Sequence, residues 1–209
     1  MDFSGTLFIF YFLPLAIAGY FLIGKLNQKL RNLFLIAISL LFYGWTEIKG
    51  VLFILCTAIY LFIFGKIIEK NRSGKLLGVS LLGLLGVLAY FKYTNFIINN
   101  LDRFLKMAIQ PRELLVPVGI SFVIFESISY LVDIYHGKRS GSLLDVLLYL
   151  SLFTKVTSGP IITWKRFEGQ IDHRDTSLSQ VADGLELLIF GLAKKVLVAD
   201  ILGALSYQI

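Results

Sequence analysis

The stretch LVPVGISFVIFESISYLVDIY, residues 115–135, has the length and apolar character of a membrane span but also carries ionisable side chains. A helix needs about 20 mostly apolar residues to cross a bilayer. Pro117 and Gly119 favour the start of a helix near the beginning of this stretch. One face of that helix, at spacing i, i+3, i+4 and i+7, carries four polar residues: Glu126, Ser129, Tyr130 and Asp133.

This polar face is predicted to point away from lipid. Ionisable groups inside a span cost a few kcal/mol, so they normally face protein or water. We predict that the four residues line the wall of a substrate funnel; the alternative is that they make hydrogen bonds between packed helices. Seven residues at about 1.5 Å rise separate Glu126 from Asp133 by roughly 10 Å along the axis. That separation excludes a carboxylate pair that shares a proton.

The composition of the whole chain agrees with a membrane protein. It has 209 residues, of which 56% are hydrophobic and 16% charged, with a mean hydropathy of +0.77. Soluble domains have about a quarter charged residues, so a soluble globular enzyme is excluded. The net charge of +6 on so apolar a chain favours the cytoplasmic membrane surface over nucleic acid as a partner. Cys56 is alone, and His136 and His173 lack ligand spacing, so we expect no metal site and no bound cofactor.

The chain is predicted to be all-α, a polytopic transmembrane helical bundle that forms a single membrane domain over residues 1–209. Two predicted spans are short, so either they lengthen into their flanks or the link 46–50 is a tight surface hairpin. Leu143–Phe153 and Leu185–Ala199 are expected to be partial, surface or re-entrant helices. The five predicted spans are Leu7–Gly24, Leu33–Trp45, Val51–Gly65, Leu76–Phe96 and Leu114–Tyr135.

The charges of the loops predict an orientation. Loops 25–32, 66–75 and 136–142 are basic, whereas the residues before the first apolar run carry no positive charge. The positive-inside bias therefore predicts an inner or plasma membrane protein with its N-terminus outside and the basic loops in the cytoplasm. The first apolar run has neither a basic start nor a clear cleavage site, so we interpret it as a retained span rather than a secretory signal.

A second segment interrupts the apolar pattern. The residues Ser158, Gly159 and Pro160 break any helix, and broken backbone at membrane depth must be buried in protein or line a wet cavity. We predict that these three residues also line the funnel.

Basic side chains accompany the two following apolar stretches. Trp164 and Phe167 are expected at the level of the lipid headgroups, where Lys165 and Arg166 either anchor the chain or form a basic rim that guides an anionic acyl donor. Lys194 and Lys195 either extend to the membrane surface or face the funnel, as further rim candidates.

Several strings together resemble the membrane-bound O-acyltransferase (MBOAT) family, in particular its bacterial alginate O-acetyltransferase-like branch. Each string alone is weak, whereas their occurrence in family order is fairly specific. The resemblance covers nearly the whole chain but only about the N-terminal half of a family member. The strings are LFYGW (41–45), PVGISF (117–122), SYLVDIY (129–135), SGPI (158–161) and GLAKKVL (191–197).

The resemblance implies an acyltransferase that moves an acyl group, expected to be acetyl, from a cytoplasmic donor to hydroxyls of an extracellular polysaccharide such as alginate. The donor, acetyl-CoA or a carrier-linked acyl group, is a substrate. The essential histidine of the family lies in its later half, beyond residue 209, and neither His136 nor His173 matches it. The chain alone is therefore expected to be inactive, and it ends after an apolar helix as a truncated product would.

The implied partners are the lipid bilayer, the polysaccharide, and either a periplasmic or extracellular acetylase or the missing C-terminal half. Two alternatives remain open at this point. One is transfer of D-alanine to teichoic acid by a related branch of the family. The other is a non-enzymatic transporter or scaffold module, because polar stripes and broken helices also occur in transporters.

Overall fold

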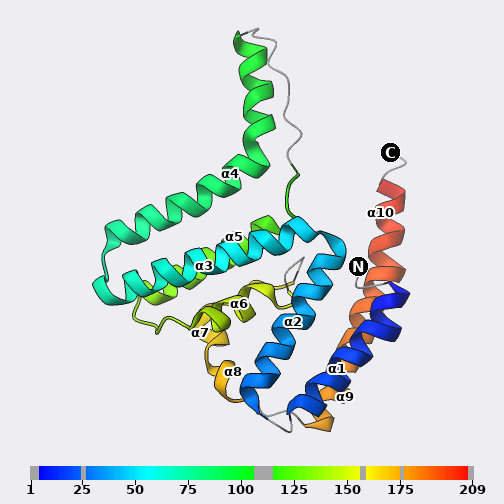
Figure 1. Ribbon diagram of the computed structural model, residues 1–209. Helices are drawn as coiled ribbons and strands as arrows, with labels where there is room; N and C mark the ends of the chain where they lie inside the picture. Colours follow the sequence, from blue (N-terminus) through cyan, green and yellow to red (C-terminus); the bar gives the residue numbers. More distant parts are fainter. Residues whose placement is uncertain (1–4, 25–26, 106–114, 156–158, 175–176, 207–209) are drawn as a thin grey trace. The chain divides into compact units, whose positions relative to one another are not determined.

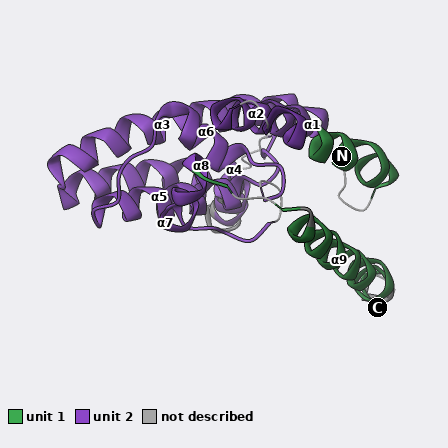
Figure 2. Ribbon diagram, turned by 90° about the horizontal axis from the view of Figure 1, so that it is seen from below, with its two compact units in different colours: residues 1–18, 173–209 green, residues 19–172 purple. Residues whose placement is uncertain are grey.

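The computed structural model describes residues 5–24, 27–105, 115–155, 159–174 and 177–206. Throughout these residues the regular structure is helical, which confirms the predicted all-α class (Figure 1). The chain divides into two compact units, each described by itself below. The larger unit is Gly19–Asp172, and the smaller unit combines Met1–Ala18 with His173–Ile209 (Figure 2).

Four long helices form the frame of the larger unit. Within the described ranges, α3 and the first part of α4, up to Asn100, are long and apolar enough to cross a membrane. The exposed surface of these two helices is rich in large apolar side chains such as Leu52, Ile63 and Leu82, as a lipid-facing surface requires. The four helices are α2 (Gln28–Thr46), α3 (Ile48–Asn71), α4 (Gly74–Leu105) and α5 (Ile120–Tyr135).

The two short predicted spans lie within the longer helices α2 and α3, which confirms that they lengthen into their flanks. Both helices extend beyond the predicted apolar segments, and Glu47 alone separates them. Gly50 allows this tight approach, because a Cβ atom there would lie 2.3 Å from a ring carbon of Tyr43. Helix α3 continues past the predicted end of the third span at Gly65, through charged residues, to Asn71.

Leu114 lies outside the described residues; of the rest of the predicted span Leu114–Tyr135, residues 115–119 are not helical and α5 begins at Ile120. Gly119 adopts a φ of 75°, a left-handed conformation that suits glycine and ends the non-helical segment before α5. The backbone of Val118 is satisfied from the α2–α3 hairpin: its N–H donates to Glu47 Oε2 at 3.0 Å, and its carbonyl accepts from the Tyr43 hydroxyl. Because both backbone groups of Val118 are hydrogen-bonded in this way, the residue is stable outside a helix.

The core of the larger unit lies around α5 and the short helix α6 (Leu143–Ser151), which pack against α2, α3 and α4. A capping box between Ser142 and Asp145 starts α6. Every residue from Val146 to Ser151 is buried, so this short helix is an interior element of the unit. The one-turn helices α7 (Trp164–Phe167) and α8 (Gly169–Asp172) follow, and side-chain amides of α2 donate to the Ile171 carbonyl.

The smaller unit contains the N-terminal and C-terminal apolar helices. The π-helical turn η1 (Phe8–Phe12) leads into α1 (Leu13–Gly24), of which the part up to Ala18 belongs to this unit, and α9 (Leu178–Lys194) leads through η2 (Lys195–Ala199) into α10 (Asp200–Ser206). An apolar groove runs between the two helical segments of this unit, lined by residues such as Leu13 and Leu188. The expected helix Leu185–Ala199 thus begins earlier, at Leu178, where Ser177 and Gln180 form a capping box.

Candidate functional site

The polar face of α5 points toward the segment that contains the predicted helix break. Glu126 and Tyr130 are buried, whereas Ser129 and Asp133 are half-buried. Ser158 lies outside the described residues; Gly159 and Pro160 lie on the described side of the break, and Pro160 is exposed. The structure therefore brings together the two segments that the sequence singled out separately.

A buried ion pair joins α5 to the residue that precedes the break. Lys155 Nζ lies 2.8 Å from Glu126 Oε2, and the two side chains are only 2% and 4% exposed. The ammonium also lies 3.9 Å from the centroid of the Tyr149 ring, a cation–π geometry. Removing a charge from water costs several kcal/mol, so each member of such a pair depends on the other.

Lys155 was not among the site residues predicted from the sequence, although its position between an apolar helix and a Gly-Pro break indicated a buried partner. A lysine directly after an apolar helix and before a Gly-Pro break must either pair with an acidic side chain or extend its ammonium group to water. Glu126 was a predicted funnel residue; in the structure its carboxylate contacts protein at this point.

A second acid of α5 holds the chain after the break. Asp133 Oδ2 accepts a hydrogen bond from the backbone N–H of Lys165 at 2.9 Å. Between these two anchors, the Tyr149 hydroxyl donates to the Ile162 carbonyl at 2.6 Å. The broken segment is thus fixed to α5 and α6 at three points. These contacts agree with the alternative prediction for the polar face of α5, that its residues make hydrogen bonds between packed elements.

The break itself depends on a glycine. The N–H of Gly159 donates to the Lys155 carbonyl at 3.0 Å, which closes a turn. A Cβ atom at Gly159 would lie 2.3 Å from Lys155 Cα and 2.8 Å from the Thr154 carbonyl oxygen. Both of these atoms belong to the backbone, so no side-chain rotation relieves the overlap.

Gly159→Ala is therefore expected to destabilise the chain, by about 1–3 kcal/mol or more, because overpacking at this position moves backbone. The matched control is Gly169→Ala, where a Cβ atom would meet nothing within 4 Å. Unfolding of both variants in detergent micelles, followed by circular dichroism, measures the difference. Equal stability of the two variants would show that the turn at Gly159 tolerates a side chain.

The aromatic residues after the break are buried, which corrects the expectation for Trp164 and Phe167. They are 1% and 8% exposed, so their rings contact protein and not lipid headgroups. The ring of Trp164 meets that of Tyr130 edge to face at 4.9 Å between centroids, and its Nε1–H donates to the Arg139 carbonyl at 3.0 Å. Periodicity could not predict this burial, because the partners come from α5, α6 and the loop before α6.

The remaining predicted residues are more exposed. Lys165 and Arg166 point their charges outward on α7, which suits either of the two roles considered for them. Lys194 is exposed in the smaller unit, and Lys195 Nζ lies 3.5 Å from Asp200 Oδ2. Among the described residues, no group of three or more His, Cys, Asp or Glu side chains is placed to hold a metal ion.

Comparison with known proteins identifies relatives along the whole chain. The probable alginate O-acetylase AlgI of Pseudomonas aeruginosa is 33% identical over 219 residues, which cover 99% of this chain and 41% of the relative. The corresponding protein of Azotobacter vinelandii is 32% identical, with 99% of this chain and 43% of that protein covered. The chain is a homologue of the alginate O-acetylases.

A more distant relative extends this group. The peptidoglycan O-acetyltransferase of Helicobacter pylori is 25% identical over 95% of this chain and 44% of its own length. The chain thus spans about two fifths of the length of the relatives that it matches. No family model and no solved structure matches it. The similarity agrees with the resemblance to the alginate branch of the MBOAT family, and with the apolar helices it supports a location in the membrane.

Proposed function

We propose that this chain is part of a membrane O-acyltransferase that transfers an acyl group, acetyl by preference, to hydroxyls of an extracellular polysaccharide such as alginate. The observation that carries the proposal is the 33% identity to an alginate O-acetylase along 99% of the chain. The peptidoglycan O-acetyltransferase among the relatives supports the same class of reaction on a different polymer. The acyl group is drawn from a cytoplasmic donor, acetyl-CoA or a carrier-linked acyl group.

The proposed role of this chain is to build one wall of the acyl passage and to anchor it in the membrane. The polar face of α5 and the break at Gly159 lie together, and the Glu126–Lys155 pair and the Asp133 hydrogen bond hold the break in one conformation. In this proposal, a wall held in one conformation orients a passing substrate without chemistry of its own. The chain is multi-pass, with its N-terminus outside and the basic loops 66–75 and 136–142 in the cytoplasm.

The base of the reaction lies outside these 209 residues in this proposal. A histidine there removes the proton from the acceptor hydroxyl, whose oxygen then attacks the acyl carbonyl carbon. The bond between this carbon and the sulfur of the donor thioester breaks, and the donor leaves as a thiol that takes up the proton from the histidine. His136 is exposed, with a ring nitrogen 2.8 Å from the Val132 carbonyl oxygen, and His173 is exposed in the smaller unit. Neither is assigned the catalytic role.

A chimera tests the proposal. The chain replaces the matching two fifths of the Pseudomonas aeruginosa AlgI in cells that make alginate and lack their own acetylase gene. We expect acetyl esters on the exported polymer with the chimera, measured by NMR, and none with the 209-residue chain alone. A chimera that reaches the membrane at normal amounts yet leaves the polymer unmodified contradicts the proposal, and esters made by the chain alone contradict the placement of the histidine.

A further inference from the structure

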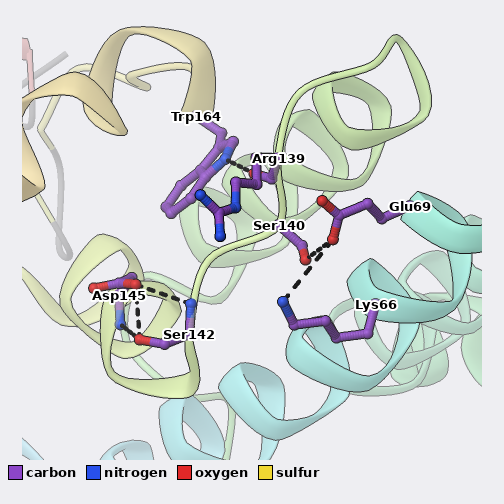
Figure 3. Close-up of polar contacts among 7 residues, drawn as sticks. All are labelled: Lys66, Glu69, Arg139, Ser140, Ser142, Asp145 and Trp164. Atoms are coloured by element: carbon purple, nitrogen blue, oxygen red, sulfur yellow. Dashed lines mark hydrogen bonds and ion pairs between the residues drawn. The ribbon is translucent and has the colours of Figure 1, made fainter.

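A cavity of about 600 Å³ opens in the larger unit beside the loop between α5 and α6. Its lining comes from three stretches that are distant in sequence: α3, the loop 139–142 with the start of α6, and the α7–α8 segment. Figure 3 shows Lys66, Arg139, Asp145 and Trp164 around the loop that carries Ser140 and Ser142. The polar face of α5 takes no part in this cavity.

The loop that shapes the cavity is held in place by its neighbours. The Ser140 hydroxyl donates to Glu69 Oε2 on α3, and the Arg139 carbonyl accepts from the Trp164 indole at 3.0 Å. A Cβ atom at Gly141 would lie 2.8 Å from the Trp164 ring, so the loop passes directly over it. These contacts tie the position of Arg139 to both α3 and α7.

The two cations of the lining, Lys66 and Arg139, make fewer close ion pairs and hydrogen bonds than Asp145 and Glu168 do. Lys66 is 48% exposed, and its one described ion pair, to Glu69, is long at 3.9 Å. The guanidinium of Arg139 is exposed and makes no ion pair within the part of the chain that the structure describes. Both cations are therefore available to an incoming group.

Two of the three acids that line the same cavity, Asp145 and Glu168, already have partners. Asp145 Oδ2 accepts from the N–H and the hydroxyl of Ser142, at 2.9 and 2.7 Å, in the capping box of α6. Glu168 Oε1 lies 2.5 Å from Lys138 Nζ. Asp172, the third acid, is exposed and leaves one further acceptor in the lining. The lining thus offers two cations to an anion and a few acceptors to hydroxyl or amide groups attached to it.

We propose that this cavity binds the phosphate group of a phosphate ester, with Arg139 and Lys66 as its two cationic contacts. The guanidinium of Arg139 presents paired N–H donors that match phosphate oxygens, and the ammonium of Lys66 adds a point charge. Asp172 accepts from a hydroxyl or amide elsewhere in the ligand. The ester is either a soluble coenzyme or the headgroup of an anionic lipid. That a soluble ligand is the acyl donor rests on the proposed function, whereas the phosphate contact itself does not.

Tryptophan fluorescence of the purified 209-residue chain reads the occupancy of the cavity. Trp45, the other tryptophan, is 72% exposed on α2, so Trp45→Phe leaves Trp164 as a single reporter in the lining. One arm titrates coenzyme A into the chain in neutral detergent. The other arm compares nanodiscs that contain phosphatidylglycerol with nanodiscs of phosphatidylcholine alone.

We expect a saturable change in at least one arm, weakened about tenfold or more by Arg139→Met and by Lys66→Met, since a hydrogen bond to a charged group is lost. Lys70→Met, an exposed cation on α3 outside the lining, is the matched control and is expected to bind as the parent does. Circular dichroism verifies that each variant is folded.

A response to coenzyme A identifies a soluble ligand, and a response to phosphatidylglycerol alone identifies a headgroup site. The proposal is overturned if fluorescence changes in neither arm. It is also overturned if Lys70→Met weakens binding as much as Arg139→Met does. Because no arm measures acyl transfer, a failure here is distinct from a failure of the chimera experiment.

Discussion

Lys155→Met is expected to lower the free energy of unfolding by about 3–5 kcal/mol, because it leaves the carboxylate of Glu126 buried without a partner. That carboxylate belongs to a side chain only 4% exposed, so water does not replace the lost ammonium. The substitution also removes the cation above the Tyr149 ring. Equilibrium unfolding of the purified chain in mixed micelles measures the change.

Two variants separate the lost pair from a general effect of the substitution. Glu126→Met combined with Lys155→Met removes both charges, and we expect it to recover most of the loss, because apolar replacement of a whole buried pair is often neutral. Lys165→Met changes an exposed lysine whose backbone N–H, not its side chain, bonds Asp133, and is expected to have a small effect. The interpretation fails if the double variant is no more stable than Lys155→Met.

The pair also shows what sequence reasoning could reach at this site. Periodicity placed Glu126 and Asp133 on one helical face, and Gly-Pro chemistry placed the break at residues 159–160. Both rules are local, and both predictions of secondary structure agree with the structure. The partner of Glu126 lies 29 residues away, and the identity of such a partner follows from tertiary packing, which no local pattern reports.

The ends of helices escaped prediction for a related reason. The apolar pattern of α3 stops at Gly65, whereas hydrogen bonding carries the helix to Asn71 through charged residues that favour helix. Hydropathy reports the part of a helix that contacts lipid or core, and not where its backbone bonds end. The cavity residue Lys66 lies in this polar extension of α3, and Arg139 lies in the loop between α5 and α6, so neither was selected as a candidate from the sequence.

Trp164→Ala is the second substitution with a large expected effect, a loss of about 3–5 kcal/mol in the free energy of unfolding. The indole is the largest fully buried side chain among the described residues, and it packs against the rings of Tyr130, Tyr149 and Phe167. Its removal leaves a void among three rings that are fixed on three different helices. The three helices cannot all move inward to fill this void. It also removes the hydrogen bond that holds the Arg139 carbonyl, so the wall of the cavity loosens together with the core.

Trp45→Ala is the matched control, because that indole is 72% exposed on α2 and its loss opens no void. We expect near-wild-type unfolding from it, while Trp164→Phe falls between the two by keeping a ring but not the N–H donor. If Trp164→Ala and Trp45→Ala unfold alike, the aromatic cluster does not stabilise this unit. If Trp164→Phe is as stable as the parent, the rings stabilise it and the bond to Arg139 does not. The order Trp45→Ala, Trp164→Phe, Trp164→Ala therefore separates ring packing from the hydrogen bond that positions the loop.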